Sequence, residues 1–312
     1  MNASFSCAPL SSEIANRLRS AGLDPVYVED LIVRTIAEDL AGGIDITSVA
    51  TVPASQTSIA SFVSRAVGVV AGADIACAVV QMVCGNDVGL IENHKKDGDT
   101  VAPGDVIVRI TATTQRMLTA ERTALNLLCH LSGVATLTNK WVQAVSGTNA
   151  IIRDTRKTTP GLRALEKYAV RCGGGQNHRM SLSDAALVKD NHVASAGGVV
   201  EAFTAVRAMD PNIVIEVEVD TLSQLQEVID AGADLVLLDN MAPTEMARAV
   251  EIVESHKAAT GRSVLLEASG GLTIEKAHAV AQTGVHFISI GGLTHSAPIL
   301  DIGLDLETVI TQ

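Results

Sequence analysis

The chain has 312 residues, a formal net charge of −12 and 47% apolar residues, of which few are aromatic. This length fits one large domain or two of moderate size, and the apolar content is enough for a substantial core. The acidic balance argues against a general nucleic-acid or membrane-surface binder.

The N-terminal part alternates between helical and strand-like segments and predicts a mixed α/β domain. Asp24 followed by Pro25 is typical of a helix start, and Gly42-Gly43 of a helix end. The expected elements are a helix over Asp24–Leu40, a strand over Ser58–Val70, a helix over Ala73–Val83, a strand-like stretch over Val101–Ile110 with a turn at Pro103-Gly104, and a long helix over Met117–Val145 that is broken near Ser132-Gly133.

From about Ala150, short apolar runs alternate with helical stretches. The predicted strands are Ala150–Arg153, Ala185–Lys189, Ile213–Glu218, Asp234–Leu238, Val264–Glu267 and His286–Ile290. The predicted helices are Leu162–Cys172, Gly198–Met209, Leu222–Ala231, Pro243–His256 and Ile274–Gln282. This alternation implies right-handed βαβ units and a parallel sheet, either closed into a barrel or open and doubly wound.

Charged or glycine-rich residues follow nearly every predicted strand. They are Asp154, Arg156 and Lys157, then Lys189 and Asp190, then Glu218, Asp239, Glu267 with Ser269, and Gly291. In a barrel the chemistry lies at the C-terminal ends of several strands, whereas an open sheet gathers ligands mainly at one switch point. The distribution therefore favours an α/β barrel.

Nothing in the sequence indicates export or a membrane anchor. No apolar run approaches the roughly 20 residues of a spanning helix, and no N-terminal leader is recognisable. The five cysteines have the spacing neither of a zinc site nor of a C-x-x-C redox pair, so we expect reduced, mostly buried thiols. We therefore predict a soluble, cytoplasmic protein.

Positive charge is concentrated in one part of this acidic chain. Residues 121–200 hold ten Lys and Arg against five Asp and Glu. Within them, Arg156 offers a planar fork for a carboxylate or phosphate, Lys157 a point charge and Thr155 a hydroxyl. A solvated turn is the alternative, because Pro160-Gly161 is turn chemistry. The position between a strand and a helix favours an anion site.

A second basic group follows three glycines. Gly173–Gly175 would let a ligand approach the backbone, although such a run is also typical of a flexible helix end. His178 and Arg179 would add donors, but a lone histidine is more often structural. Lys189 ends a strand as a surface cap or a functional cation. It is also where a Schiff-base enzyme would carry its lysine.

Carboxylates and glycine turns complete the candidate site. Glu218 and Asp239 would stabilise a cationic transition state, hold ribose hydroxyls, or bind Mg²⁺ directly or through water. Asp220 precedes a helix, so we expect it to be an N-cap. Ser269-Gly270-Gly271 and Ser289-Ile290-Gly291 follow the last two strands, where barrels commonly bind a phosphate, here a 5′-phosphate.

Together these elements resemble the quinolinate phosphoribosyltransferase family, also called nicotinate-nucleotide pyrophosphorylase (carboxylating). The most specific part is Asp-Thr-Arg-Lys-Thr with Pro-Gly-Leu-Arg at 154–163, followed by Gly-Gly-Gly-x-Asn-His-Arg at 173–179. The matching segments span most of the chain after Arg116: Glu121–Asn126, Leu131–Gly133, Asp154–Arg163, Lys167–Arg179, Leu187–His192, Glu216–Val219, Leu237–Asn240, Glu267–Gly271 and Phe287–Ser296.

The resemblance implies an N-terminal α/β sandwich domain over 1–125, to which the tail 293–312 returns, and an open C-terminal α/β barrel of about six parallel strands over 126–292. It implies a homodimer in which each site takes Arg122 from the other subunit; by position alone Arg122 would be an ordinary solvated helix residue. It also implies Mg²⁺ as cofactor. The reaction would join phosphoribosyl pyrophosphate to quinolinate, giving nicotinate mononucleotide, pyrophosphate and CO₂ in de novo NAD biosynthesis.

The resemblance also distributes roles over the site. The expected catalytic residues are Lys157, Lys189, Glu218 and Asp239, the last two also as metal ligands. The expected substrate-binding residues are Arg122, Thr155, Arg156, His178, Arg179, Ser269, Gly270, Gly271, Ser289, Ile290 and Gly291. Among these, the arginines and His178 would hold the carboxylates, and the two lysines would neutralise phosphates.

Three rival functions remain open at this point. A nicotinate phosphoribosyltransferase would handle one carboxylate, for which four candidate carboxylate binders are more than needed. A Schiff-base aldolase would use Lys189 as its nucleophile. A protein that binds a small anion without turnover would not need Glu218 and Asp239.

Overall fold

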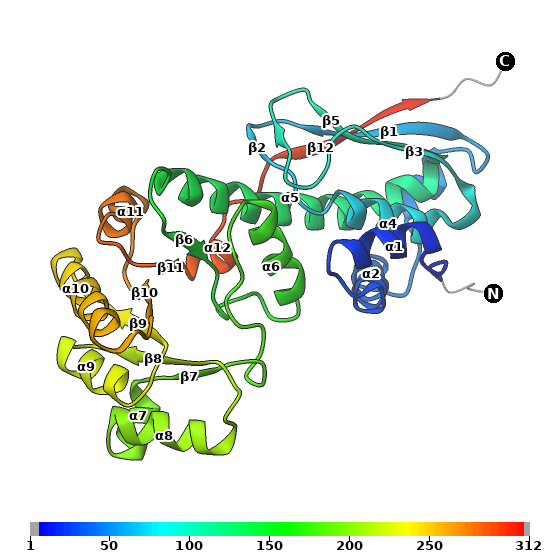
Figure 1. Cartoon of the computed structure of the whole chain (residues 1–312). Coiled ribbons are helices and arrows are strands. Elements are labelled where there is room, and N and C mark those ends of the chain that lie inside the picture. Colours follow the sequence, from blue (N-terminus) through cyan, green and yellow to red (C-terminus); the bar gives the residue numbers. More distant parts are fainter. Residues whose placement is uncertain (1–5, 309–312) are drawn as a thin grey trace. The chain divides into compact units, whose positions relative to one another are not determined.

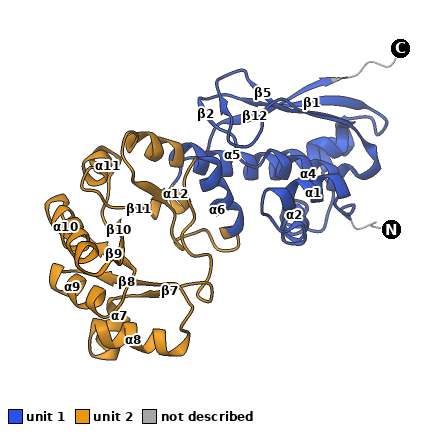
Figure 2. Cartoon of the chain, viewed as in Figure 1, with its two compact units in different colours: residues 1–137, 164–173, 297–312 blue, residues 138–163, 174–296 orange. Residues whose placement is uncertain are grey.

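The structure, a computed structural model, describes residues 6–308. Residues 1–5 and 309–312, which belong to the predicted N-terminal domain and its returning tail, lie outside this range. The chain forms two compact units (Figure 2). The first comprises residues 1–137, 164–173 and 297–312, and the second residues 138–163 and 174–296.

The first unit contains a four-stranded antiparallel sheet in the order β12-β1-β5-β3 (Figure 1). Its strands are β1 (Thr57–Ser64), β3 (Val88–Asn93), β5 (Val106–Thr113) and β12 (Ile302–Thr308), and a separate pair is formed by β2 (Gly68–Val69) and β4 (Thr100–Val101). Its helices are α1 (Ser12–Ser20), α2 (Pro25–Leu40), α3 (Ile46–Thr51), α4 (Ala73–Cys84) with the 3-10 turn η1 (Gly85–Asp87), most of α5 (Thr114–Ala144), and α6 (Arg163–Cys172). The C-terminal strand β12 pairs with β1 from Ser58 to Ser64.

The start of α2 follows its sequence signals. The Asp24 side chain accepts a hydrogen bond from the Val26 N–H at 3.0 Å, and Pro25 occupies the first turn. The helix ends at Leu40, as predicted, and its C-cap Ala41 takes up the left-handed conformation (φ 45°) that is more usual for glycine. The prediction for this helix is confirmed.

The predicted break of α5 near Ser132-Gly133 is wrong, because the helix is continuous from Thr114 to Ala144. Both residues serve packing instead. The Ser132 hydroxyl exchanges hydrogen bonds with the Ala71 N–H (3.0 Å) and carbonyl (3.2 Å). A Cβ at Gly133 would lie 2.2 Å from the Pro298 carbonyl oxygen, so glycine is required where the two backbones meet.

The second unit is built on a six-stranded parallel sheet in the order β6-β11-β10-β9-β8-β7. The strands are β6 (Ile151–Arg153), β7 (Ala186–Val188), β8 (Ile215–Val219), β9 (Leu235–Asp239), β10 (Leu265–Ser269) and β11 (Phe287–Ser289). All six agree with the predicted strands to within two residues. Within residues 6–308 the two edge strands β6 and β7 are not paired with each other, so the sheet is open. The predicted α/β fold class is confirmed.

Helices connect these strands and cover the sheet (Figure 1). They are α7 (Asp190–Ala196), α8 (Val199–Met209), α9 (Leu222–Asp230), α10 (Pro243–Thr260), α11 (Ile274–Ala281) and α12 (Gly292–His295). The short α7 and α12 were not predicted, because seven and four residues carry too little helical periodicity. No helix among the described residues is both long and apolar enough to cross a bilayer.

The predicted N-cap at Asp220 is wrong. Helix α9 is capped one residue later by Thr221, whose hydroxyl accepts the Gln224 N–H at 3.2 Å. The Gln224 side chain in turn accepts the N–H groups of Thr221 (3.2 Å) and Asp220 (2.8 Å). This reciprocal capping box occupies the helix start and leaves Asp220 exposed just outside it.

Candidate active site

A cavity of about 700 Å³ opens at the C-terminal ends of the parallel strands, within the second unit. Its walls come from the loop after β6, from the segment after α6 and from the ends of β7 to β11. The lining residues are Thr155, Arg156, Lys157, His178, Arg179, Leu187, Lys189, Asp190, Glu218, Leu237, Asp239, Asn240, Glu267, Ser269, Gly270, Gly271 and Ser289. Twelve of the fifteen site residues predicted from the sequence are among them.

Successive side chains along a strand point to opposite faces of the sheet, so only every second residue can reach this cavity. Residues two apart share one face of a strand. The pairs Leu237/Asp239 on β9 and Glu267/Ser269 on β10 both line the cavity. The intervening residues Leu238 and Ala268 are fully buried on the opposite face.

Two arginines in the cavity, Arg156 and Arg179, are not paired with any carboxylate of residues 6–308. The Nε atom of Arg156 is buried and has no hydrogen-bond partner in the part of the chain that the structure describes. Arg179 donates from Nη1 to the Ala185 carbonyl at 2.9 Å. Burial and then the charge of Arg156 lower the pKa of Arg179, while Asp184 and Glu216 act in the opposite direction. Two neighbouring guanidinium groups with unused donors are suited to an anion with two carboxylates.

The loop after β6 is held by its own threonines and by α12. The Thr155 hydroxyl accepts the Lys157 N–H at 3.0 Å, and the Thr294 hydroxyl donates to the Lys157 carbonyl at 2.7 Å. Arg163 ties down the far end of the loop through Thr158 at 3.1 Å. The Lys157 side chain is exposed at the cavity wall, so a hydrogen-bonded loop presents its cation to the cavity.

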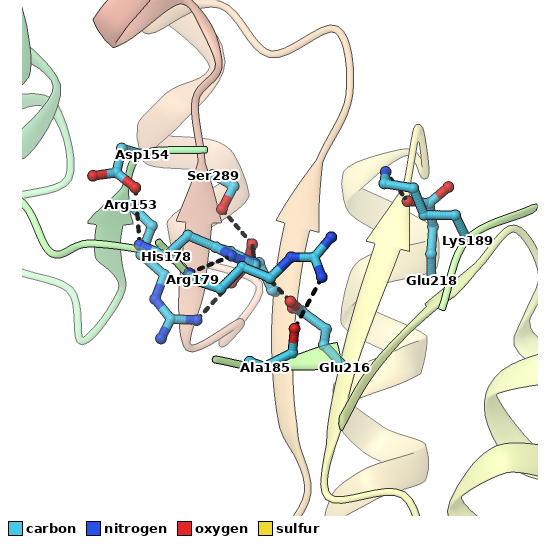
Figure 3. A network of polar contacts seen from close by, with 10 residues as sticks. Arg153, Asp154, His178, Arg179, Ala185, Lys189, Glu216, Glu218 and Ser289 are labelled. Atoms are coloured by element: carbon cyan, nitrogen blue, oxygen red, sulfur yellow. Dashed lines mark hydrogen bonds and ion pairs between the residues drawn. The ribbon is translucent and has the colours of Figure 1, made fainter. Parts of the chain in front are cut away.

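Carboxylates at the ends of β8 and β9 face the same cavity. Glu218, 11% exposed, accepts from Lys189 Nζ at 2.8 Å (Figure 3). Asp239 accepts from the Asn240 side chain at 2.6 Å. Asn240 has a left-handed backbone (φ 52°), a strained conformation that is typical of functional sites. The cavity therefore carries opposite charges on neighbouring strand ends.

The glycine turn after β10 is packed against Asn240. Gly270 has φ 90°, and a Cβ there would lie 2.2 Å from the Asn240 side-chain oxygen and 2.9 Å from its backbone nitrogen. Only glycine fits this turn without moving the Asp239–Asn240 segment. Gly270 and Gly271 both line the cavity.

His178 lies in a network of buried charges at the cavity wall (Figure 3). Its Nδ1 accepts the Arg179 backbone N–H at 2.7 Å, and its Nε2 lies 2.6 Å from Glu216 and 3.5 Å from Glu267. Glu267 accepts from Arg153 at 2.8 Å and from the Ser289 hydroxyl. Burial, and then the charge of Glu216, raise the pKa of Glu267 despite the counteracting effects of His178, Ser289 and Arg153.

Three predicted site residues do not line the cavity. Ile290 is buried, and Gly291 packs against the loop after β6, with a Cβ position 3.0 Å from Lys157 Cδ and 3.7 Å from the Thr155 hydroxyl. Arg122 is exposed on α5, in the first unit.

Several residues that line the cavity, and the buried residues that hold them in place, were not predicted as site residues. The lining residues that were not assigned to the site are Leu187, Asp190, Leu237, Asn240 and Glu267, although Asp190 and Glu267 were noted as charges at strand ends. The supports that were not assigned are Arg153 and Glu216. The period of two would have found Leu237 and Glu267, since each precedes a predicted site residue by two positions.

Two family models match consecutive parts of the chain, and both describe the same family. The family model "Quinolinate phosphoribosyl transferase, N-terminal domain" matches residues 45–132, and "Quinolinate phosphoribosyl transferase, C-terminal domain" matches residues 134–305. A Mycobacterium leprae protein named nicotinate-nucleotide pyrophosphorylase (carboxylating) is 50% identical over 277 residues, which cover 89% of this chain and 96% of that one.

Solved structures are similar over nearly the whole chain. A nicotinate-nucleotide pyrophosphorylase from Francisella tularensis has a TM-score of 0.82 and 37% identity, covering 90% of this chain and 96% of that one. The NadC structure from Streptococcus pyogenes has a TM-score of 0.86 and 36% identity, covering 92% and 99%.

Proposed function

Because this chain belongs to the quinolinate phosphoribosyltransferase family, we propose that the cavity described above binds and joins this family's two substrates. The enzyme transfers phosphoribosyl from phosphoribosyl pyrophosphate to quinolinate with decarboxylation. The products are nicotinate mononucleotide, pyrophosphate and CO₂, in de novo NAD biosynthesis.

One observation supports quinolinate as the acceptor above all others. Arg156 and Arg179 share a cavity, and neither guanidinium is paired with a carboxylate of the described chain. Quinolinate has two carboxylates on neighbouring ring carbons, and an arginine fork binds a carboxylate through two parallel hydrogen bonds. Nicotinate, with one carboxylate, would leave one of the two cations without a partner.

The phosphoribosyl pyrophosphate would lie along the strand ends from β8 to β11. We assign its 5′-phosphate to the turns Ser269–Gly271 and Ser289–Gly291. The first turn and Ser289 line the cavity, whereas the Ile290 N–H is already used by the Arg153 carbonyl, so the first turn would supply most of the contacts. Lys157 and Lys189, both exposed at the cavity, are placed to neutralise the pyrophosphate and part of the quinolinate charge. Thr155 shapes the loop that carries Lys157.

The donor set at the ends of β8 and β9 fits Mg²⁺, which prefers oxygen ligands and usually retains water and substrate phosphate in its shell. Glu218 and Asp239 each use one oxygen for a protein partner, Lys189 or Asn240. In residues 6–308 the second oxygen of each carboxylate has no hydrogen-bond partner, so it is available to an ion or its water. Bound there, Mg²⁺ would neutralise the leaving pyrophosphate.

The chain's own residues act by position and charge. Arg156 and Arg179 orient quinolinate so that its ring nitrogen attacks the ribose carbon as the bond to pyrophosphate breaks. Glu218 and Asp239 face the positive charge that develops on the sugar. The ribosylated ring nitrogen is then cationic and stabilises the electron pair that stays on the neighbouring ring carbon when the carboxylate of that carbon departs as CO₂. The ring carbon takes up a proton, and no covalent enzyme intermediate is needed.

We also propose a homodimer in which Arg122 completes the neighbouring subunit's site. Arg122 is exposed and makes no hydrogen bond or ion pair with the described residues, so its guanidinium is available to a ligand. A cytoplasmic location would suit the five cysteines, all of which are free thiols. The alternative of a Schiff-base lysine is less suitable, because Lys189 is engaged with Glu218.

The test is release of CO₂ from quinolinate labelled in the carboxylate next to the ring nitrogen. Purified protein with phosphoribosyl pyrophosphate and Mg²⁺ should release labelled CO₂ and form nicotinate mononucleotide in equal amounts. Consumption of nicotinate without consumption of quinolinate would overturn the proposal. Borohydride trapping of a substrate adduct on Lys189 would favour the Schiff-base alternative.

A further inference from the structure

Three alternate strands of the parallel sheet contribute charged side chains to one buried layer. Arg153 comes from β6, Glu216 from β8 and Glu267 from β10, and their side chains are 18%, 2% and 0% exposed. His178, 10% exposed, joins the two carboxylates. In α/β barrels such a layer is normally filled by Val, Ile and Leu from alternate strands.

This layer is unfavourable for folding. It places two carboxylates within reach of one histidine, with a single arginine to balance them. Glu216 is the less well supported of the two, since its Oε1 is buried and has no partner in the described part of the chain. A buried carboxylate with an unsatisfied oxygen destabilises a fold relative to an apolar side chain of similar size. A feature of this kind beside an active site points to function.

His178, Glu216 and Glu267 bring their ligand atoms within 4.8 Å of one another, but the hydrogen bonds of His178 argue against a metal site. Nδ1 of His178 accepts the Arg179 N–H, so its lone pair is in use. Nε2 then carries the ring proton and donates it to Glu216. Neither nitrogen offers a lone pair to a metal, so the layer acts through hydrogen bonds.

Those hydrogen bonds run from the layer to the cavity. Glu216 fixes the His178 ring through Nε2, and the ring fixes the Arg179 backbone through Nδ1. The chain next to His178 is also held, because Asp154 accepts the His178 N–H at 2.9 Å. Arg179 then leaves this anchored backbone with its guanidinium directed to the cavity and to Ala185 (Figure 3).

We propose that Glu216 is a positioning residue for quinolinate: it holds His178 so that Arg179 presents its fork to the substrate carboxylate. This assignment rests on the proposed function. Glu216 does not line the cavity and cannot touch substrate, so it acts through its two neighbours. Glu267 also supports His178, but it has Arg153 and Ser289 as further partners and lines the cavity itself. Of the two, Glu216 is therefore the cleaner test.

The test compares Glu216→Leu with Glu216→Gln. Leucine fills the space but cannot accept the Nε2 proton, and a misplacement of about 1 Å in a binding group can lower rates about 100-fold. We expect Glu216→Leu to raise the KM for quinolinate about 10- to 100-fold while the KM for phosphoribosyl pyrophosphate stays nearly constant. Glutamine is isosteric and keeps an accepting oxygen, so Glu216→Gln should recover most of the loss.

The chain offers a matched control in its other unit. Glu166 is also fully buried and bonded to a histidine, His130, at 2.9 Å. Glu166→Gln should leave both KM values unchanged, with thermal unfolding confirming that each variant folds. An unchanged quinolinate KM in Glu216→Leu, equal rises in both KM values, or failure of Glu216→Gln to recover would each overturn the assignment. Wild-type protein inactive toward quinolinate would instead overturn the proposed function.

Discussion

Two arginines three residues apart should respond in opposite ways to the same substitution. Arg153 is inside the buried layer, 2.8 Å from Glu267, with its guanidinium 3.7 Å from the centre of the Phe287 ring. Arg156 lines the cavity and has a buried Nε without a partner in the described chain. Replacing either with methionine keeps the length of the side chain and removes the charge.

The structure gives the expected magnitudes. Arg153→Met leaves a buried carboxylate without its cation, which costs about 3–5 kcal/mol of unfolding free energy. In a unit of this size that lowers the melting temperature by about 6–20 °C. Among the described residues, Arg156→Met breaks no side-chain hydrogen bond or ion pair, and it relieves repulsion with Arg179, so stability should change by less than about 0.5 kcal/mol.

Enzyme activity should be affected most by the variant that changes stability least, Arg156→Met. Loss of two charged hydrogen bonds to a substrate carboxylate, at about 1.5–3 kcal/mol each, predicts that kcat/KM for quinolinate falls about 100- to 10,000-fold in Arg156→Met. The assays are thermal unfolding without ligand and initial rates of CO₂ release. The reasoning is refuted if Arg156→Met unfolds as early as Arg153→Met, or if it retains wild-type kcat/KM.

Three further predictions follow from other parts of the chain. Inactive Arg122→Ala and Lys189→Ala subunits, once mixed, should recover part of the activity if each site is shared between subunits, and no recovery in verified mixed dimers would exclude sharing. Gly270→Ala should raise the KM for phosphoribosyl pyrophosphate at least tenfold, because the new Cβ would lie 2.2 Å from the Asn240 side-chain oxygen and displace that side chain. A tenfold change corresponds to about 1.4 kcal/mol, which is within the usual strain of a left-handed backbone at a non-glycine residue. Wild-type kinetics would contradict this prediction. Burial lowers the pKa of His286 from 6.5, so the unfolded chain binds more protons there and the free energy of unfolding should rise with pH until about 6.5 and then level off. Urea unfolding below and above that pH should show a smaller rise in His286→Gln, and an unchanged rise would contradict the assignment.

The parallel strands were predictable because burial on both faces leaves a continuous apolar run. Ala-Leu-Val before Lys189 and Leu-Val-Leu-Leu before Asp239 are such runs, each ended by the charge that reaches the cavity. The course of α5 was not predictable in the same way. Gly133 is required in mid-helix because the backbone of Pro298, 165 positions later, leaves no room for a side chain, and no local signal in the sequence indicates that contact.

The division of the site into binding and supporting residues was beyond the sequence for a related reason. The strand Ile-Glu-Val-Glu-Val offers Glu216 and Glu218 on the same face, and residue type does not distinguish them. Their positions along the strand distinguish them. Glu218 lies at the strand end and lines the cavity, whereas Glu216 lies two residues earlier, is buried and contacts His178. Arg153 and Arg156 differ in the same way, because Arg153 lies within strand β6 and Arg156 in the loop that follows it.

Folding and binding place opposite demands on these charges. The unpaired Arg156, the lowered pKa of Arg179 and the orphaned oxygen of Glu216 each reduce the stability of the empty protein. Each also keeps a cation, or the group that orients it, in place before the substrate arrives, which lowers the cost of reorganisation on binding. An anion with two carboxylates would supply one carboxylate partner to each of Arg156 and Arg179. Quinolinate bound in the cavity should therefore stabilise the second unit, by an amount that grows with the logarithm of ligand concentration once the site is saturated, and neutral pyridines of the same size should not.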